Sequence, residues 1–331
     1  MSTPTAGTTY YLQTYYDEYI CQWNDGNCYY DGSWSDGNQG LEADATVSAT
    51  PALPTPPQTA TSYSNLECWG LSGYPGYSSP LNLSYRKDFW NDWTPYDGNQ
   101  TGSNGSGSDS MSPGQSISGT GPCGSLVINS QLTSGTEWNA LGALNVCGSF
   151  TQYTCPSTPN NLEVDMQFTI PDGTTYQALE FDPDFTTSDN KFTYTESVEC
   201  DFSSGIWKYW DSSAVAWQPF SNIGINNVPS CSLATGRHHL QLYVTSVYTS
   251  TTHTYQYQEM IVDGQVLFDS PSDAVTAWDT LAQNSPCQGF QEYIGVEQQV
   301  DNHYTNSAST SCGTSSTNVC AYYDHYSLVI W

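Results

Sequence analysis

Hydrophobic and polar residues alternate strictly over residues 161–185, on both sides of an Asp172-Gly173 pair. A period of two is typical of half-buried β-strands, and Asp-Gly is a preferred turn pair. The pattern predicts a β-hairpin with one apolar face and one acidic face, in which Asp165 lies opposite Asp182. Carboxylates directly opposite each other are destabilising unless a metal ion, shared protons or an exposed polar groove offsets the repulsion.

From about residue 120 onward, short alternating runs recur between turn residues. Their spacing predicts an all-β fold, an antiparallel β-sandwich of the jelly-roll type over residues 120–331, with one short helix at Ser272–Gln283. We expect strands near residues 125–130, 161–170, 176–185, 191–197, 205–211, 237–247, 254–262, 265–269, 293–301 and 321–331.

Residues 1–119 have a different texture, rich in Tyr, Asp-Gly pairs, Pro, Thr, Gly and Ser. This composition predicts a turn-rich extension or small cap with too little aliphatic content to form a core alone. Its aromatic residues must therefore pack either on the sandwich or on a neighbouring copy. We favour the neighbour, which predicts a homo-oligomer or fibre built through this extension.

The charge balance narrows the classes of partner. Only 5 Lys and Arg residues accompany 33 Asp and Glu residues among 331, so the formal net charge is −28. A nucleic acid or an anionic membrane is disfavoured because no basic patch is available to release counterions. The sequence contains no run of 18 consecutive apolar residues, so it does not predict membrane insertion. The 25 Tyr, 11 Trp and 10 Phe residues argue against a disordered acidic chain.

Eleven cysteines without any C-x-x-C spacing indicate disulfides and an extracellular protein, with Met1 standing where a signal peptide was removed. We expect short loops to be closed by Cys21 with Cys28, Cys147 with Cys155 and Cys312 with Cys320. A longer loop joins Cys200 with Cys231. One cysteine is left over, and the candidates are Cys68, Cys123 and Cys287.

The run RHHLQLYVTSV followed by YQYQEMIVDGQVLF resembles the laminin-G and concanavalin A-like lectin group. Residues 120–331 more closely resemble secreted acidobacterial and metagenomic proteins of unassigned function. That resemblance rests on QALEFDPDF, the Cys200 and Cys231 positions, WKYWDSSAVAWQPF, QVDNHY and YDHYSLVIW. It implies the sandwich fold and says little about activity, because one fold supports many functions.

Three interpretations of the acidic residues remain open. They form a solvated surface, or they act as a glycosidase pair, or they bind calcium. Concanavalin-like glycosidases use two carboxylates on neighbouring strands, which implies Glu180 with Asp165 or Asp182 here. Calcium prefers six to eight oxygen ligands, and Asp182 and Asp184 are the candidates.

Aromatic and amide side chains supply the second candidate site. If Trp210 packs inward, then Trp207 and Tyr209 face outward, where with Trp217 they offer flat rings to sugars. Gln299 and Asp301 are expected to bond sugar hydroxyls. The alternative for these rings is packing alone.

No zinc-ligand spacing, no G-x-S-x-G elbow and no P-loop occurs, which disfavours the corresponding chemistries. We therefore predict an extracellular lectin-like protein that binds a polysaccharide or cell-surface glycan. The alternatives are a glycoside hydrolase and a structural surface or fibre subunit.

Overall fold

The computed structural model shows β-strands joined by turns, and two short 3-10 helices occur in the part of the chain that it describes. It describes strand segments between residues 9 and 46, and residues 53–69, 71, 94–96, 105–115, most of 117–148, 161–186, 193–195, 197–211, 214, 216–248, 253–269, 293–303, 312 and 318–331. Within these residues no helix is long and apolar enough to cross a membrane. The predicted helix at Ser272–Gln283 lies outside them. The chain divides into two compact units, Met1–Ala52 and Leu53–Trp331.

The first unit contains two small antiparallel pairings. Strand β1 (Thr9–Tyr10) pairs with β4 (Ala45–Thr46), and β2 (Tyr15–Cys21) pairs with β3 (Cys28–Ser35). The β2–β3 register places Cys21 directly opposite Cys28. This is the backbone arrangement that the predicted disulfide requires, although the bond itself lies outside the described side chains and stays a prediction.

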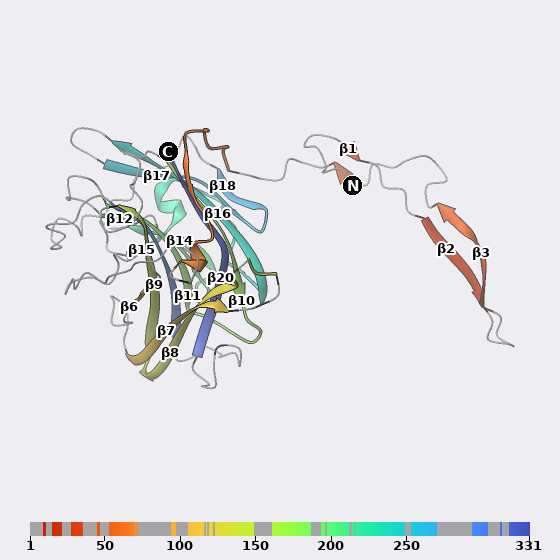
Figure 1. Ribbon diagram of the computed structural model, residues 1–331, viewed down its shortest axis with the longest axis horizontal. Helices are drawn as coiled ribbons and strands as arrows, with labels where there is room; N and C mark the ends of the chain where they lie inside the picture. Colours follow the sequence, from red (N-terminus) through yellow and green to blue (C-terminus); the bar gives the residue numbers. More distant parts are fainter. Residues whose placement is uncertain are drawn as a thin grey trace. The chain divides into compact units, whose positions relative to one another are not determined.

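The second unit is a sandwich of two eight-stranded antiparallel sheets, seen from the side in Figure 1. We call them the β10 sheet and the β11 sheet after their central strands. The β10 sheet runs in the order β18 (Gln265–Asp269), β17 (His253–Val262), β16 (Gly236–Tyr248), β10 (Asn161–Ile170), β20 (Asn318–Ile330), β8 (Ser125–Gly135) and β7 (Gly105–Gln115), with β5 (Thr61–Tyr63) also on β20.

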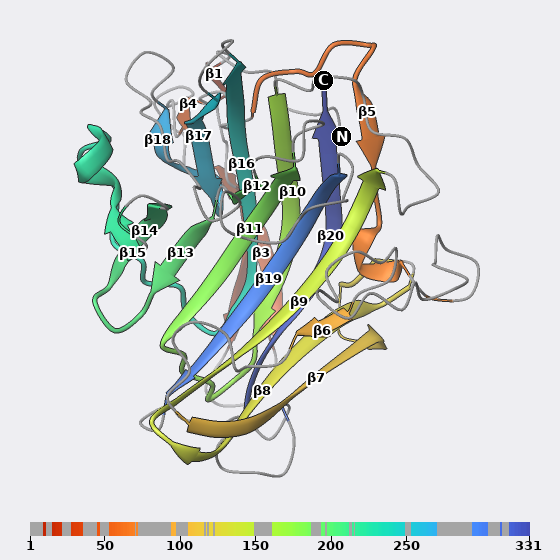
Figure 2. The same ribbon diagram turned by 90° about the vertical axis from the view of Figure 1, so that its left-hand side faces the viewer.

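The β11 sheet faces the viewer in Figure 2. Its order is β15 (Ala216–Pro219), β14 (Ile206–Asp211), β13 (Val198–Asp201), β11 (Ala178–Thr186), β19 (Tyr293–His303), β9 (Glu137–Gly148) and β6 (Thr94–Tyr96), with β12 (Thr193–Thr195) also on β11. Successive strands repeatedly change sheet, as in the step from β8 to β9 and from β19 to β20. The all-β jelly-roll sandwich predicted from the alternating runs is confirmed, including a strand at or near each expected position.

The predicted hairpin between β10 and β11 is wrong. Asp172-Gly173 does form a turn, with Gly173 in the left-handed region at φ 76°, but the two strands that follow and precede it belong to different sheets. The apolar faces therefore meet across the sandwich, and the rings of Phe168 and Phe181 lie 5.1 Å apart. This arrangement buries both apolar faces at once and separates Asp165 from Asp182, which removes the repulsion that a hairpin would have imposed.

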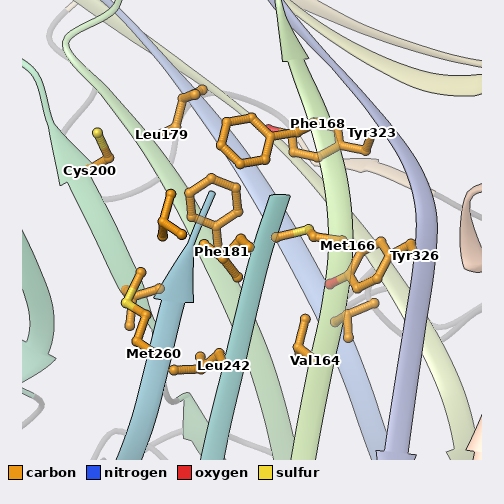
Figure 3. Packing of buried hydrophobic residues seen from close by; sticks show 14 of the residues in the cluster. Val164, Met166, Phe168, Leu179, Phe181, Cys200, Leu242, Met260, Tyr323 and Tyr326 are labelled. Atoms are coloured by element: carbon orange, nitrogen blue, oxygen red, sulfur yellow. The ribbon is translucent and has the colours of Figure 1, made fainter. Parts of the chain in front are cut away.

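The core lies between the two sheets and is formed by alternate residues of each strand. Figure 3 shows Val164, Met166 and Phe168 of β10 facing Leu179 and Phe181 of β11. One polar pair is buried among them, where the Gln298 amide of β19 donates to the Tyr326 hydroxyl of β20 at 2.8 Å. Because a buried amide is costly without a partner, this bond favours one register of the two sheets over others.

Three disulfides are described in the second unit. Cys200–Cys231 and Cys312–Cys320 confirm the predicted pairings. Cys68–Cys123 is a correction, because both residues were candidates for the unpaired cysteine. Spacing alone missed this bond because its partners are 55 residues apart and meet only through the fold. Cys147 is also disulfide-bonded, while Cys155 and Cys287 lie outside the described residues.

The segment around the 3-10 helix η1 (Leu66–Cys68) is part of the sandwich. Leu66 is fully buried in the core, and the Glu67 carboxylate accepts the backbone N–H groups of His325 at 3.1 Å and Tyr326 at 3.0 Å. These two residues lie at the irregularity where β20 shifts register against β10, and His325 has φ 49°. Glu67 therefore satisfies donors that the β20 bulge cannot pair within the sheet.

The expected boundary between residues 119 and 120 does not match this arrangement. Strands β5, β6 and β7 and helix η1 all precede residue 119, yet all belong to the unit that begins at Leu53. These strands contain few aliphatic residues, so no alternation of apolar and polar positions predicted them; β7, for example, consists largely of Ser and Gly.

Candidate functional site

The outer face of the β11 sheet, which points away from the core, carries most of the predicted site residues. Leu179 and Phe181 point into the core, so the intervening Glu180 and Asp182 point outward. Across the sheet, Glu180 lies opposite Gln299 of β19 on one side and Glu199 of β13 on the other. Glu199 in turn lies opposite Lys208 of β14. We call this line of residues the central row.

Two further rows flank the central row. Asp182 lies opposite Glu297. In the central row Glu180 of β11 is level with Lys208 of β14. Since both strands run antiparallel to β13, the residues two positions further along, Asp182 and Trp210, are level as well. On the other side, Ala178 lies opposite both Asp201 and Asp301. The sequence predicted an acidic face on a hairpin of residues 161–185. The structure instead gathers carboxyl groups from β11, β13 and β19 on one sheet surface, and β10 does not contribute.

Three carboxyl groups converge at the centre of this face. Oxygen atoms of Glu180, Glu199 and Asp301 all lie within 4.8 Å of one another. Each residue is less than a tenth exposed. Glu180 and Asp301 are hydrogen-bonded to each other, and the Gln299 amide donates to Asp301 at 2.9 Å. Two carboxyl groups can share a hydrogen bond only when one of them is protonated.

Burial is the main cause of the raised pKa values in this cluster. It raises the pKa of Glu180 well above 4.5, with the charges of Asp301 and Asp182 adding to the effect. Burial also raises the pKa of Glu199 to about 8, against the lowering effect of Lys208. The pKa of Asp301 rises to about 7, again chiefly through burial. The cluster therefore retains protons near neutral pH.

Asp201 has the opposite character. Burial raises the pKa of its carboxyl group, but hydrogen bonds from Lys208, Ser204 and Ser203 outweigh burial and lower the pKa to about 2. The Lys208 ammonium group contacts Asp201 and also lies 3.3 Å from Glu199. A single lysine thus holds an ionised carboxylate beside a cluster that keeps its protons.

The aromatic prediction is partly wrong. Trp207 and Tyr209 are each only 3% exposed and belong to the core, where Tyr209 packs on Phe220 and Tyr257. The assumption that Trp210 points inward was reversed. Trp210 lies opposite Trp217 on the outer face, with ring centroids 5.4 Å apart and an edge-to-face angle of 70°. Trp217 is therefore the one predicted platform residue that the fold places beside the carboxylates.

Asp165 is a further correction, because it lies on the outer face of the other sheet. Its carboxylate contacts His239 Nε2 at 2.8 Å and accepts the Gln241 amide at 2.8 Å. The hydrogen bond that His239 donates to the Asp165 carboxylate raises the pKa of His239. With the whole sandwich between them, Asp165 and Glu180 are not available to act as a catalytic pair.

The calcium prediction at Asp182 and Asp184 is not tested, since the Asp184 side chain lies outside the described residues. Among the described residues, Glu180, Glu199 and Asp301 form an acidic group whose oxygen atoms lie close enough together to coordinate a metal ion. The Lys208 ammonium group and shared protons offset their charge in part. Carboxylates and a lysine so arranged need no metal ion to coexist.

Glu199, Asp201, Lys208 and Trp210 were missed as site residues. A signal for the first two was present in the sequence, since Val198-Glu199-Cys200-Asp201 alternates with the period of a strand. The run of four is too short to be distinguished from a loop without the neighbouring strands. Trp210 required knowledge of which ring of the aromatic run faces the core.

No family model and no curated protein matches the sequence. Solved structures of similar fold include a variant of the alginate lyase Aly36B in complex with alginate tetrasaccharide. It shares 15% identity, covers 81% of this chain and 96% of that chain, and has a TM-score of 0.39.

Two others are the Emp47p carbohydrate recognition domain and a Bacillus licheniformis β-glucanase. The first shares 11% identity over 84% of this chain and 99% of that chain, with a TM-score of 0.37. The second shares 9% over 82% and 99%, with a TM-score of 0.35. The similarity concerns the layered sandwich, so function is inferred from the residues of this chain.

Proposed function

We propose that the outer face of the β11 sheet binds a polysaccharide, and that the protein is an extracellular glycan-binding protein. The observation that carries the proposal is the alignment of the Trp210–Trp217 pair with Asp182, beside the central row of Lys208, Glu199, Glu180 and Gln299. Aromatic rings stack on the apolar faces of sugar rings, while carboxyl and amide groups bond their hydroxyls.

The spacing suits an extended ligand. Trp210 and Asp182 lie on strands two positions apart, which corresponds to about 10 Å across the sheet. A ligand stacked on the tryptophans and bonded to the carboxyl groups must span that distance, which favours an oligosaccharide chain over a single sugar. The described disulfides support an oxidising, extracellular setting.

The test is glycan binding by the intact chain and by variants of one face. Trp210→Ala and Trp217→Ala are expected to weaken polysaccharide binding about tenfold or more, because each removes a stacking surface. The matched control is Tyr243→Ala, which removes a half-buried aromatic ring from the outer face of the β10 sheet, where it stacks on Trp331. Equal losses in all three variants, or no binding by the intact chain to any glycan, would reject the proposal.

Hydrolysis of the bound glycan is the second candidate, and the protonated state of Glu180 favours it. A buried carboxyl group with a raised pKa is suited to donate a proton to a leaving glycosidic oxygen. Against this, the carboxyl groups of Glu180 and Asp301 are hydrogen-bonded directly to each other, which leaves no space for a substrate or a water molecule between them. Glycosidase carboxyl pairs are spaced about 5–5.5 Å or 6.5–9.5 Å apart, with substrate or water between them.

We therefore favour binding without cleavage. Release of reducing sugar ends would identify a hydrolase if it disappears in Glu180→Gln and persists in Asp165→Asn. Asp165 is the matched control because its carboxylate occupies the outer face of the other sheet. Absence of any release from a glycan that the protein binds is the expected result.

A further inference from the structure

The charges on the outer face of the β11 sheet restrict the kind of glycan that it accepts. Its three rows present the following acidic side chains: Glu180, Asp182, Glu199, Asp201, Glu297 and Asp301. They come from the three adjacent strands β11, β13 and β19, so a ligand that lies across these strands passes over them. Any acidic group on that ligand is brought close to several carboxyl groups.

Lys208 is the cation on the described part of this face, and its ammonium group is already engaged. It contacts Asp201 and lies 3.3 Å from Glu199. Arg237, the other cation among the described residues, lies on the β10 sheet and contacts Asp324 there.

The hydrogen-bonding capacity of the face suits hydroxyl groups. Protonated carboxyl groups of the central cluster donate as well as accept, and the Gln299 amide has both functions. A uronate or sulfate group only accepts hydrogen bonds, so it leaves the acceptor oxygens of this face without a donor, whereas a hydroxyl group can donate to them and also accept from the protonated carboxyl groups. Like charges held close together in an interface repel each other and weaken binding.

We infer that the glycan bound by this face carries no acidic groups, so that polymers of uronic acids and sulfated sugars are excluded. The inference rests on the proposed function of the same face and specifies its ligand class. It separates this chain from proteins that bind alginate, a polymer with a carboxylate on every sugar, although the sandwich fold is shared.

The experiment compares matched polymers that differ only in the acidic group. Suitable pairs are cellulose with its C6-oxidised form, polygalacturonate with its carboxyl-reduced form, and alginate with its carboxyl-reduced form. Binding of the full chain to each polymer is measured at low salt and in about 0.5 M NaCl. In every pair that binds, the affinity for the uncharged member is expected to exceed that for the acidic member by about tenfold or more at low salt. The ratio of the two affinities should be smaller at high salt.

A Glu297→Gln variant sharpens the comparison. Glu297 lies opposite Asp182 on the same face, and removing its charge is expected to narrow the gap between the acidic and uncharged members without changing the fold. Equal or tighter binding of the acidic member in any pair overturns the inference and leaves the proposed function standing. Failure to bind any pair or any other glycan overturns both.

Discussion

At the scale of single residues, Lys208 lies beside two carboxyl groups whose pKa values are shifted in opposite directions. Asp201 receives hydrogen bonds from Lys208, Ser203 and Ser204 and has a pKa of about 2, whereas Glu199 has a pKa of about 8 although Lys208 is 3.3 Å away. The difference arises because Asp201 has several donors, while Glu199 is buried next to other acids.

Replacing Lys208 with Met is expected to destabilise the fold by roughly 2–4 kcal/mol, because an ionised Asp201 would be left without its charged partner. Urea unfolding at pH 7 measures the change. The triple variant Lys208→Met, Glu199→Gln, Asp201→Asn serves as the control and is expected to recover most of the loss. A single-variant loss below about 0.5 kcal/mol would show that the ion pair is unimportant.

Glu163 provides a second residue-scale prediction, on the β10 sheet. Its Oε1 atom is buried with no hydrogen-bond partner, and its side chain faces Tyr243. Burial raises its pKa to about 7, and the charges of Asp165 and Glu259 add to this. Because the folded pKa exceeds the unfolded value of about 4.5, its contribution is fully present below pH 4.5 and is lost as the pH rises to 7.

The stability of the natural chain relative to Glu163→Gln is therefore expected to fall between pH 4.5 and 7, by at most about 3 kcal/mol, since one pKa unit corresponds to about 1.4 kcal/mol. Denaturant unfolding of both proteins at several pH values gives this difference directly. Glu137→Gln, at a half-buried position of β9, is the comparison. A difference that stays constant with pH for Glu163→Gln would contradict the assignment.

At the scale of elements, the Cys200–Cys231 disulfide joins a strand to a segment that follows it. Cys200 of β13 is bonded to Cys231, which lies just before β16. The covalent loop that this bond closes contains β14 and β15, and therefore both residues of the Trp210–Trp217 pair. The local order of the aromatic rings on the outer face therefore depends on a covalent constraint as well as on strand pairing.

Replacing both Cys200 and Cys231 with Ser is expected to lower the unfolding free energy by about 3–4 kcal/mol, the chain-entropy estimate for a separation of 31 residues. Thermal unfolding measures the loss, and hydrogen exchange should show its largest increase in β13–β15. Replacing Cys312 and Cys320, separated by 8 residues, is the control and is expected to cost less. Equal effects of the two double variants would exclude loop closure as the cause.

At the scale of the whole molecule, the net charge of −28 and the buried carboxyl groups act in the same direction. Raised pKa values for Glu163, Glu180, Glu199 and Asp301 mean that the folded state binds protons more tightly than the unfolded state. Stability then decreases as the pH rises from about 5 to 8. Asp201, with its lowered pKa, loses its contribution as the pH falls below 4 towards 2.

The melting temperature is accordingly expected to be highest near pH 4–5 and to decline towards pH 8. Differential scanning calorimetry across this range tests it. Because exposed carboxylates repel one another most when ionised, about 0.5 M NaCl should raise the melting temperature more at pH 8 than at pH 4.5. A maximum at or above pH 7 would contradict the proposed proton sharing.

The division at Ala52 and Leu53 also bears on assembly. Strand β5 pairs with β20 and Tyr63 is buried in the core, so only residues before Leu53 remain as the element proposed to contact a neighbouring copy. A chain of residues 53–331 is expected to keep the melting temperature of the sandwich and to be monomeric. Multi-angle light scattering of both chains decides the matter, and an intact chain that is already monomeric removes the proposed oligomer.

Alternation along the chain was sufficient to predict a strand at or near each of the ten expected positions and the jelly-roll class, and cysteine spacing predicted Cys200–Cys231 and Cys312–Cys320. Strands β5, β6, β7, β9, β13 and β15 were not predicted; β7 is largely Ser and Gly, and β13 spans only four residues. Glu180, Gln299 and Asp301 were also candidate site residues from the sequence, but in two separate sites, and the pairing of β11 with β19 placed them on one surface. Whether β10 and β11 share a sheet, which tryptophan of β14 faces outward and which cysteine pairs with Cys68 depended on packing between distant segments. A period of two fixes alternation but not the side that faces the core, and the burial of Phe168 against Phe181 settled both the sheet assignment and the exclusion of Asp165.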